Sequence, residues 1–257
     1  MRGALKHPLR VAGRLLWLAG EIIIAAVNFV FLVLLRSERP LLAARAQWLQ
    51  QGCRRVLRIF NAEVRTSGPI PKSGLLVSNH LSYVDILALS ALTPSIFVAK
   101  REVKKWPVFG WFACLGGTMF TDREKRTQVA DLTKALRTAL DEGALVVLFP
   151  EGSSSDGQTV LPFKSALLEP ATGSSYPVSA GLIEYRLEDG DAGEEVCYWK
   201  DMTLVPHLVN LLSKRRVQVS IQFSELRQGS TNRKELARQL HAEVLKLKEN
   251  RYSPAFG

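Results

Sequence analysis

The sequence predicts an α/β fold, with a central mixed sheet flanked by helices and an N-terminal, membrane-associated two-helix element. From about residue 62, short apolar runs alternate with segments of helical periodicity, as they do where helices cover a sheet. Before that point the chain is strongly apolar and then basic. We therefore expect a membrane-binding helical element at 1–61, one folded domain at 62–250 and a flexible tail at 251–257.

Composition narrows the class of protein. The chain has 257 residues, of which 47% are hydrophobic and 23% charged, so it is long and apolar enough to bury a core. The net charge of +10 predicts an anionic partner such as an anionic membrane, a phosphorylated substrate or an acidic carrier protein. Because no zinc-finger spacing or RNA-binding aromatic signature accompanies the charge, we expect no nucleic acid partner.

The cysteines indicate a reducing compartment. Cys53, Cys114 and Cys197 are far apart and form no CxxC pair. A scattered, odd set favours neither a disulfide framework nor a structural metal site. We expect no metal and no cofactor.

The most apolar segment, Leu15 to Leu35, is about long enough to cross a bilayer, which takes roughly 20 apolar residues. Glu21 and Asn28 interrupt it, and no small-residue cleavage site follows, so we expect an anchor rather than a cleaved leader. Basic residues lie on both sides: Arg2, Lys6, Arg10 and Arg14 before it, and Arg36, Arg39 and Arg45 after it. Since positive residues prefer the cytoplasmic side, a monotopic element that enters and leaves one leaflet satisfies both flanks.

A second helix is expected from Leu41 to Phe60. Its apolar residues recur at helical spacing, and Arg54, Arg55 and Arg58 lie between them. A basic amphipathic helix of this kind is suited to the headgroup layer of a membrane. The alternative is that both N-terminal helices pack on the folded domain as ordinary core.

The folded domain is expected to contain eight strands and four helices. The strands are expected at Ala62–Thr66, Leu75–Ser78, Ile96–Ala99, Thr118–Thr121, Leu145–Phe149, Val178–Tyr185, Val196–Trp199 and Val217–Phe223. The helices are expected at Ser82–Leu92, Lys125–Glu142, Thr203–Leu212 and Asn232–Lys248.

A histidine and an aspartate lie five residues apart where the second of these strands meets the first of these helices. His80 falls on the turn between them, and Asp85 falls in the first helical turn. A carboxylate can hold a histidine ring in one tautomer and stabilise it after proton uptake, which is the arrangement of a general base acting on a hydroxyl group. The structural alternative is a helix that starts at Ser82 with Asp85 in a capping box and His80 as a polar loop residue.

Three further blocks follow in order. The first, Gly116 to Arg123, joins a glycine turn to a short strand that leads to an arginine. The second, Phe149-Pro150-Glu151-Gly152-Ser153, ends the most apolar strand, and the third, Tyr176-Pro177-Val178, begins another. As an ordered set these blocks are far more specific than any one of them alone.

Together the four blocks resemble the lysophospholipid acyltransferase superfamily, which includes bacterial 1-acyl-sn-glycerol-3-phosphate acyltransferases. That family shows N-H-x4-D, G-x-x-F-x-x-R, F-P-E-G-[ST] and a Pro-Val strand in this order, and the likeness extends from about Gly74 to Tyr185. The resemblance implies a membrane-bound O-acyltransferase on the cytoplasmic face, in a bacterial inner membrane. The implied donor is acyl-CoA or acyl carrier protein, and the default lysolipid acceptor is lysophosphatidate.

The resemblance also implies site residues. His80 would take the proton from the acceptor hydroxyl, with Asp85 orienting it. Arg123 would bind an anionic headgroup, because guanidinium pairs with phosphate in a bidentate manner. The remaining implied substrate-binding residues are Glu151 and Gly152, which would shape the acceptor site, and Lys100, which would contact phosphate or donor.

Two departures from the family pattern bear on the acceptor. The family often reads F-P-E-G-T-R-S, whereas Ser153-Ser154-Ser155 here lacks that arginine, which disfavours a phosphate-monoester acceptor. Residues 198–207 resemble a segment of lyso-ornithine lipid acyltransferases, so lyso-ornithine lipid or another lysolipid is the alternative acceptor. Within this segment, His207 is interpreted as structural or headgroup-adjacent rather than catalytic.

Two other function classes remain less favoured. The presence of all four polar motif residues argues against a non-catalytic, basic membrane-binding module; these residues are His80, Asp85, Arg123 and Glu151. A serine hydrolase using the Ser153–Ser155 run would need a G-x-S-x-G elbow, which the sequence lacks there.

Overall fold

A seven-stranded mixed sheet forms the centre of the protein in a computed structural model that describes residues 7–34, 41–121, 126–226 and 230–250. The strand order is β1-β7-β6-β2-β5-β3-β4. Neighbouring strands run parallel except β6 and β7, which are antiparallel. The strands are β1 (Ala62–Ser67), β2 (Gly74–Ser78), β3 (Ser95–Lys100), β4 (Met119–Thr121), β5 (Leu145–Leu148), β6 (Val178–Leu187) and β7 (Val217–Glu225). The predicted α/β class and mixed sheet are confirmed.

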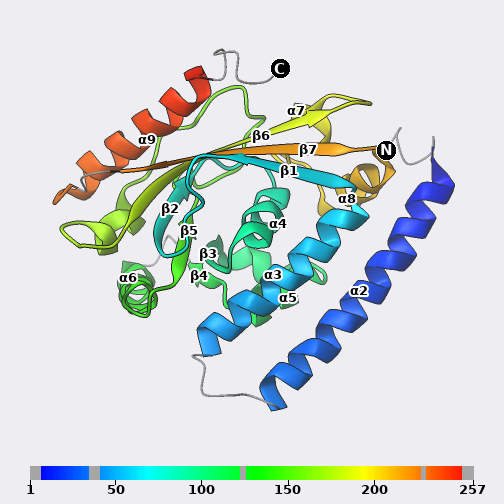
Figure 1. The fold of residues 1–257 in the computed structure, drawn as a ribbon, viewed down its shortest axis with the longest axis horizontal. Coiled ribbons are helices and arrows are strands. Elements are labelled where there is room, and N and C mark those ends of the chain that lie inside the picture. The colour runs from blue at the N-terminus through cyan, green and yellow to red at the C-terminus, as the bar shows by residue number, and fades with distance from the viewer. Residues whose placement is uncertain (1–6, 35–40, 122–125, 227–229, 251–257) are drawn as a thin grey trace.

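Helices cover both faces of this sheet, with α9 on one side and α3 and α4 on the other (Figure 1). The α-helices are α2 (Pro8–Leu34), α3 (Leu41–Ile59), α4 (Tyr83–Leu92), α5 (Phe109–Leu115), α6 (Arg126–Asp141), α7 (Ala192–Glu195), α8 (Leu204–Ser213) and α9 (Arg233–Glu249). Two 3-10 helices are η1 (Arg101–Lys105) and η2 (Ala166–Ala171).

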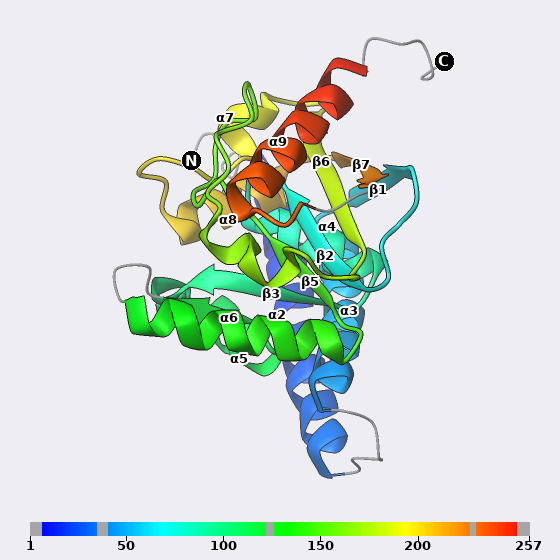
Figure 2. The ribbon, with the colours of Figure 1, turned by 90° about the vertical axis from the view of Figure 1, so that its left-hand side faces the viewer.

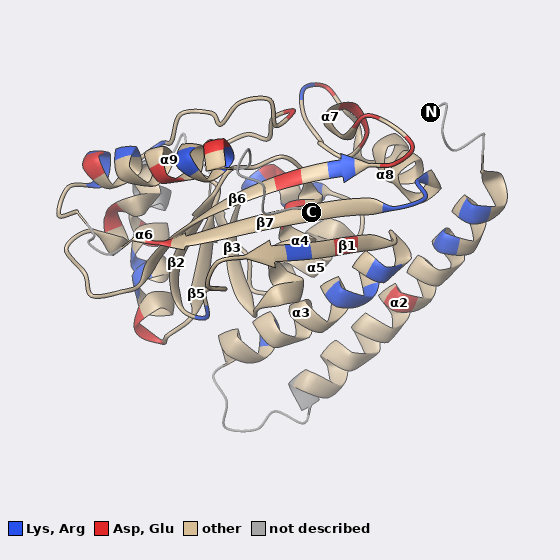
Figure 3. Ribbon diagram, turned by 45° about the horizontal axis from the view of Figure 1, so that its top comes forward, with Lys and Arg blue, Asp and Glu red and all other residues tan. Residues whose placement is uncertain are grey.

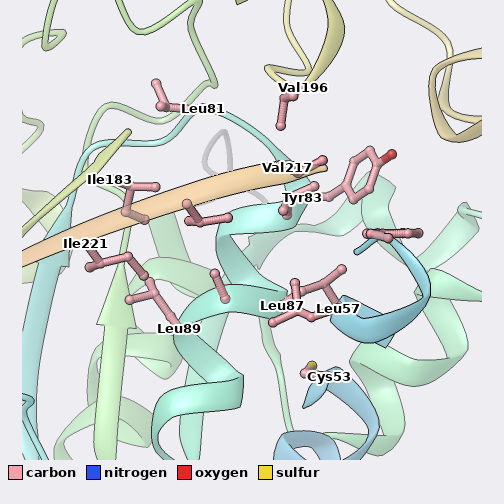
Figure 4. Packing of buried hydrophobic residues seen from close by; sticks show 14 of the residues in the cluster. Cys53, Leu57, Leu81, Tyr83, Leu87, Leu89, Ile183, Val196, Val217 and Ile221 are labelled. Carbon is pink, nitrogen blue, oxygen red and sulfur yellow. The ribbon is translucent and has the colours of Figure 1, made fainter. Parts of the chain in front are cut away.

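The larger core lies between the sheet and α3, α4 and α8. Cys53 and Leu57 of α3 face Leu87 of α4, and Ile183 and Ile221 of the sheet pack beneath α4 (Figure 4). All five side chains are buried. Burial of apolar area on this scale is the main term that stabilises the domain.

The second core lies on the opposite face, under α6 and α9. Leu136 and Leu140 of α6 and Leu236 and Leu240 of α9 are buried there against alternate residues of β2, β5 and β6. Gly143 follows α6 at a φ of 76°, a left-handed conformation that glycine commonly adopts just after a helix. The tail predicted at 251–257 lies outside the described residues.

The N-terminal helix α2 is tied to the body at several points along its length. Arg10 and Arg14 donate from their guanidinium groups to backbone carbonyls at the C-terminal end of α8, at distances of 2.6 to 3.0 Å. Cations are favourable at this end of a helix because the last carbonyls are unsatisfied. Further along, Glu21 forms an ion pair with Arg55 of α3 at 2.7 Å. The acidic residue that interrupts the apolar segment is therefore neutralised by the neighbouring helix.

The joined ends of α2 and α3 project beyond the rest of the molecule (Figure 2). The described part of α2 includes a 25-residue stretch, Pro8–Leu32, that is long and apolar enough to cross a membrane. Leu16, Ile23 and Phe31 are among its exposed side chains, at 76%, 64% and 55%. Within the described parts of α2 and α3, most charged residues lie toward the end nearer the body (Figure 3).

One predicted strand is wrong, and several short helices were not predicted. Val196–Trp199 is not a strand: Val196 and Cys197 donate from their backbone N–H groups to Ala192 O, closing the end of α7. Both side chains are buried all the same, because a loop can fill a core with apolar residues as a strand does. The short elements α5, α7, η1 and η2 span too few residues to show a helical period.

Candidate active site

The carboxyl ends of four parallel strands meet at one edge of the sheet, and the predicted polar residues follow them. His80 lies two residues after β2, Lys100 ends β3, and Glu151 lies three residues after β5. Ligands of open α/β sheets characteristically bind outside the carboxyl ends of the strands. This edge is therefore the candidate active site.

The turn that carries His80 is fixed to the sheet by the residue before it. The Asn79 side chain donates to Ile183 O at 2.9 Å and accepts from Ile183 N at 2.8 Å. The Asn79 amide thereby pairs with the backbone N–H and carbonyl of Ile183 on β6, as a backbone residue of an adjacent strand would. The buried Asn79 side chain therefore holds the turn against β6.

The His80 ring is oriented by Asp85. Nδ1 of His80 lies 2.7 Å from Oδ2 of Asp85. The same oxygen accepts from the backbone N–H groups of Leu81 at 2.7 Å and Ser82 at 3.0 Å. An ionised carboxylate can only accept, so Nδ1 of His80 carries the proton and Nε2 is left as the basic nitrogen. Asp85 therefore both orients His80 and bonds to the start of α4, so the two predicted roles are combined.

A buried tyrosine completes the shell around Asp85. The hydroxyl of Tyr185, on β6, donates to the second carboxylate oxygen of Asp85. Burial and the adjacent carboxylate raise the pKa of Tyr185 well above its ordinary value, so the phenol stays protonated and remains a donor. Asp85 is fully buried, so its charge is compensated by four hydrogen-bond donors of the protein. They are the ring of His80, the backbone N–H groups of Leu81 and Ser82, and the hydroxyl of Tyr185.

The segment after β5 holds His80 from its other side. The His80 ring stacks on Phe149, with ring centroids 4.2 Å apart and an interplanar angle of 16°. The backbone N–H of His80 donates to Oε2 of Glu151 at 3.0 Å, and the backbone N–H of Ser155 donates to the backbone carbonyl of His80 at 3.0 Å. The backbone and the ring of His80 are thus both fixed by contacts to residues 149–155.

Glu151 is a buried carboxyl group with two backbone donors. Its other oxygen accepts from the N–H of Leu161 at 2.9 Å. Burial raises the pKa of Glu151 to about 7, although the donors from His80 and Leu161 act in the opposite direction. Gly152 follows at a φ of 80°, and its N–H closes the turn onto Phe149 O. A left-handed residue at this position favours glycine, and the turn directs Glu151 back beneath His80.

The remaining predicted site residues are placed less fully. Lys100 is exposed at the end of β3, in register with Thr121 of β4. Arg123 lies outside the described residues. A cavity of about 320 Å³ at this edge is lined by Phe149, Thr121 and Lys164, so it lies beside the ring that stacks on His80. The Thr121 hydroxyl is buried and has no hydrogen-bond partner among the described residues.

His207 belongs to a separate buried network. Its Nε2 donates to Cys197 O at 3.1 Å, and its Nδ1 accepts from the Tyr83 hydroxyl at 3.0 Å. Burial lowers the pKa of His207, which favours the neutral ring that this pattern requires. Tyr198 packs edge-on against both rings. The Tyr198 N–H also donates to Leu81 O at 2.7 Å, which links this network to the His80 turn.

Comparison with known proteins places the chain in a family. A family model described as Acyltransferase matches residues 61–180. The lyso-ornithine lipid O-acyltransferase of Brucella abortus is 37% identical over 205 residues, which cover 74% of this chain and 77% of that protein. The chain belongs to the acyltransferase family.

Two further relatives agree with this assignment. The 1-acyl-sn-glycerol-3-phosphate acyltransferase of Neisseria gonorrhoeae is 35% identical over 162 residues, which cover 63% of each chain. The crystal structure of the 1-acyl-sn-glycerophosphate acyltransferase of Thermotoga maritima has the same fold, with a TM-score of 0.66 at 20% identity. That match covers 96% of this chain and 98% of the other. The protein is therefore an enzyme, an acyltransferase of the lysophospholipid acyltransferase family.

The sequence predicts His80, Asp85 and Glu151 as site residues, but it does not predict the contacts of Tyr185 and Phe149 with them. Tyr185 was expected only as the end of an apolar strand, and Phe149 only as part of a motif. No spacing rule finds Tyr185, because it lies 100 residues from Asp85 and meets it only through the pairing of β2 with β6. In the described part of the acyltransferase, no group of three or more His, Cys, Asp or Glu side chains is placed to hold a metal ion.

Proposed function

We propose that this acyltransferase moves a fatty acyl chain from a thioester donor to the free hydroxyl of a membrane-bound lysolipid. The His80–Asp85 pair carries the proposal, because the bond at Nδ1 leaves Nε2 of His80 as a base. Nε2 takes the hydroxyl proton while the acceptor oxygen bonds to the thioester carbonyl carbon. The carbon–sulfur bond then breaks, and the departing thiolate takes up the proton from the imidazolium. The acceptor oxygen itself attacks, so the reaction needs no acyl-enzyme.

The surrounding residues have supporting roles in this proposal. Asp85 orients His80 and stabilises the imidazolium that forms during transfer. Glu151 and Gly152 hold the His80 backbone and shape the acceptor site beneath it. The proposed contacts to anionic parts of the substrates are Arg123, for the acceptor headgroup, and Lys100, for phosphate or donor.

The proposed acceptor is a lysolipid without a phosphate monoester, of the lyso-ornithine type. Ser154 takes the place of the family's arginine, and its hydroxyl donates to Tyr198 O, so this position closes a loop instead of binding phosphate. The 37% identity with a lyso-ornithine lipid O-acyltransferase points the same way. Lysophosphatidate is the second candidate, since Arg123 retains a phosphate-binding side chain and a relative named for that acceptor is 35% identical.

The proposed donor is an anionic carrier of an acyl thioester, either acyl-CoA or acyl carrier protein. Arg101, Lys104 and Lys105 of η1 are exposed directly after Lys100, on the strand end that borders the site. A cluster of cations beside the reacting edge attracts phosphates or an acidic protein surface.

We further propose that residues 1–61 bind the cytoplasmic face of the membrane, in bacteria the inner membrane, as a monotopic element beside the catalytic domain at 62–250. The bonds from Arg10 and Arg14 to α8 keep the start of α2 on the same side as the body. A single crossing that left the N-terminus on the far side of the bilayer would have to break these bonds. Exposed apolar residues of α2 would lie in one leaflet, and Arg54 and Arg58 of α3 would meet anionic headgroups.

An acceptor panel tests the proposal. Purified enzyme in vesicles would be given a labelled acyl thioester with lyso-ornithine lipid, lysophosphatidate or a zwitterionic lysophospholipid. We expect transfer to lyso-ornithine lipid with the highest kcat/KM. Preference for lysophosphatidate would establish the second candidate, and transfer to none of the three would contradict the proposed function.

A further inference from the structure

The cavity of about 320 Å³ beside the candidate active site has a mixed lining. Most of the lining is aliphatic and comes from the ends of β3 and β5 and from η2: Val98, Leu148, Ala166, Leu167 and Leu168. Two polar side chains interrupt it, Thr121 at the end of β4 and Lys164 shortly before η2. No acidic residue is among the described residues that line the cavity. The lining therefore suits a ligand that is largely apolar, carries a few hydrogen-bonding groups and has no cationic group.

The Thr121 hydroxyl is the observation that points to a ligand. The Thr121 side chain is 2% exposed, and its hydroxyl has no hydrogen-bond partner among the described residues. Buried hydroxyl groups are nearly always hydrogen-bonded, because leaving one without a partner is destabilising. A ligand that brings an amide group into the cavity would supply the missing partner.

The cavity adjoins the proposed base. Phe149, which lines it, also stacks on the His80 ring, with ring centroids 4.2 Å apart. Pro150, the next lining residue, accepts from the backbone N–H of Lys164 at 3.0 Å. This bond holds the segment of Lys164 against the strand end that leads to Glu151. A ligand that fills the cavity therefore has one end beside the reacting group.

The cavity lies on the face of the sheet opposite α3 and α4. Leu148 and Leu168 belong to the core under α6 and α9, and Val98 and Leu167 pack against that core. The helix α3, which is proposed to meet lipid headgroups, packs on the other face (Figure 1). The lysolipid comes from the bilayer beside α2 and α3, so the face that holds the cavity favours the substrate that arrives from water, the acyl thioester.

The cations around the cavity match the phosphate of such a donor. Lys100, at the end of β3, is in register with Thr121, and the exposed cations of η1 follow Lys100 directly. Lys164 adds a cation in the lining itself. Acyl-CoA and acyl carrier protein present their thioester on the same phosphopantetheine arm. This arm consists of a phosphate followed by a chain of methylene, methyl and amide groups, and it carries no cationic group.

We propose that this cavity binds the phosphopantetheine arm of the acyl donor, with the Thr121 hydroxyl bonded to an amide of the arm and Lys164 paired with the phosphate. The proposal rests on the proposed function and adds the donor site to it. The aliphatic lining would contact the methylene and methyl groups, and the thioester would lie beside Phe149 and His80. An ornithine headgroup fits less well, because its amino group would meet no carboxylate in the described lining.

The variant Thr121→Val tests the amide contact, because it removes the hydroxyl and keeps the shape of the side chain. Its kcat/KM would be measured with acyl-CoA, with acyl carrier protein and with an acyl ethanethiol thioester, which has no arm. We expect a loss of about fivefold with whichever of the two carriers the enzyme uses, no loss with the ethanethiol ester and an unchanged KM for the lysolipid. The matched control is Thr138→Val on the exposed side of α6, which should leave every value unchanged.

The variant Lys164→Gln tests the phosphate contact. Because Lys164 is exposed, we expect its loss to lower kcat/KM only about threefold with acyl-CoA. Acyl-pantetheine lacks the phosphate, so its kcat/KM should be the same for Lys164→Gln and wild type. Lys134→Gln, on the exposed side of α6, is the control and should behave as wild type with both donors.

Equal losses with and without the arm would overturn the proposal, and so would a rise in the KM for the lysolipid, which would assign the cavity to the acceptor. A binding measurement separates failure of this proposal from failure of the proposed function. Calorimetry would compare the affinity for butyryl-CoA of His80→Ala enzyme with and without Thr121→Val. A loss of about fivefold supports the donor site even without turnover, and an unchanged affinity contradicts it. Butyryl-CoA binding without any acyl transfer by the wild type would contradict the proposed function alone.

Discussion

The base at the centre of the proposed mechanism depends on contacts from distant parts of the chain. Asp85 accepts from His80 and from two backbone N–H groups beside it, and also from Tyr185 100 residues away. Glu151 holds the His80 backbone from a third segment. A fully buried carboxylate is costly unless its charge is satisfied, so the orientation of His80 rests on all of these donors together.

Replacing Tyr185 with phenylalanine should reduce turnover without weakening acceptor binding. Tyr185→Phe removes a hydroxyl that donates to Asp85 and leaves a buried carboxylate oxygen without that partner. Hydrogen bonds to charged groups contribute about 1.5–3 kcal/mol, so we expect kcat to fall about tenfold or more while KM changes little. Steady-state kinetics would measure both values.

The surface tyrosine Tyr176 provides the control for that variant. Its hydroxyl also donates to an aspartate, Asp141, but far from the site and in contact with water. Tyr176→Phe should retain wild-type kcat. Equal activity of Tyr185→Phe and Tyr176→Phe would show that Tyr185 does not position Asp85.

The raised pKa of Glu151 predicts a pH-dependent contribution to stability. Burial moves this pKa from its ordinary value of 4.5 to about 7, so between these values the folded protein binds more protons than the unfolded chain. The contribution of Glu151 to the free energy of unfolding therefore falls as pH rises through this window, by on the order of 3 kcal/mol, and is constant above it.

The variant Glu151→Gln tests this by removing the titrating group. The free energy of unfolding of wild type minus that of Glu151→Gln, from denaturant titrations, should decrease between about pH 4.5 and about 7. A difference that is flat across this window, or that increases, would contradict the raised pKa. Activity should also fall in Glu151→Gln, because the amide oxygen can accept from only one of the backbone N–H groups of His80 and Leu161, and the NH₂ group cannot accept from the other.

For individual site residues, the sequence predicts those that belong to the motifs, but not those that hold the motif residues in place. His80 and Asp85 are separated by five positions, so a strand followed by a helix already brings them together. Tyr185 and Asn79 act through the register of β2 and β6, which no local pattern encodes. The position of Arg123 lies outside the described residues, and its contact with a headgroup stays a prediction.

Among the elements, α2 and α3 differ most from ordinary surface helices. In the described part of these helices, the projecting end exposes apolar side chains, and most charged residues lie nearer the body (Figure 3). Arg45, the charged residue of α3 nearest this end, donates to Leu115 O at 2.7 Å and to Cys114 O. The Arg45 guanidinium therefore pairs with backbone carbonyls at the C-terminal end of α5. This distribution suits insertion of the projecting end into one leaflet, with the cations at headgroup level.

The basic face of α3 predicts a dependence on anionic lipid. A cation near an anionic membrane surface contributes about 1 kcal/mol, so Arg58→Gln should weaken binding to anionic vesicles about fivefold and leave binding to neutral vesicles unchanged. Vesicle co-sedimentation at several salt concentrations would measure this. Arg238→Gln is the control, because Arg238 lies on α9, across the sheet from α3 (Figure 1). An equal loss in both variants would argue against the proposed orientation.

Elements with a clear hydrophobic period were predictable, and short or loop-bound apolar runs were not. The stripe formed by Leu132, Leu136 and Leu140 identifies α6, and these residues are buried as a helical period requires. Val196–Trp199 has the composition of a strand, but the backbone N–H groups of Val196 and Cys197 donate to the carbonyl of Ala192, the first residue of α7. An apolar run predicts that its side chains are buried. Whether the run is a strand or a loop depends on the hydrogen-bond partners of its backbone.

For the molecule as a whole, topology places the chemistry at one edge of the sheet. The carboxyl ends of parallel β2, β4 and β5 bring the first three sequence blocks to this edge, whereas Tyr176-Pro177-Val178 begins β6 at the opposite edge; α2 and α3 lie beside this domain (Figure 1). The order of the blocks predicts the family and the fold. It does not predict the acceptor, because headgroup choice depends on a few side chains such as Ser154 in place of an arginine.

The most direct test of the central claim compares His80→Ala with wild type in vesicles that contain the preferred lysolipid and a labelled acyl thioester. His241→Ala, on the opposite face of the sheet, is the matched control. We expect His80→Ala to lower acyl transfer about a thousandfold, since general bases contribute roughly 10²- to 10⁴-fold, while vesicle binding stays unchanged. Transfer by His80→Ala within a few-fold of wild type would contradict His80 as the base.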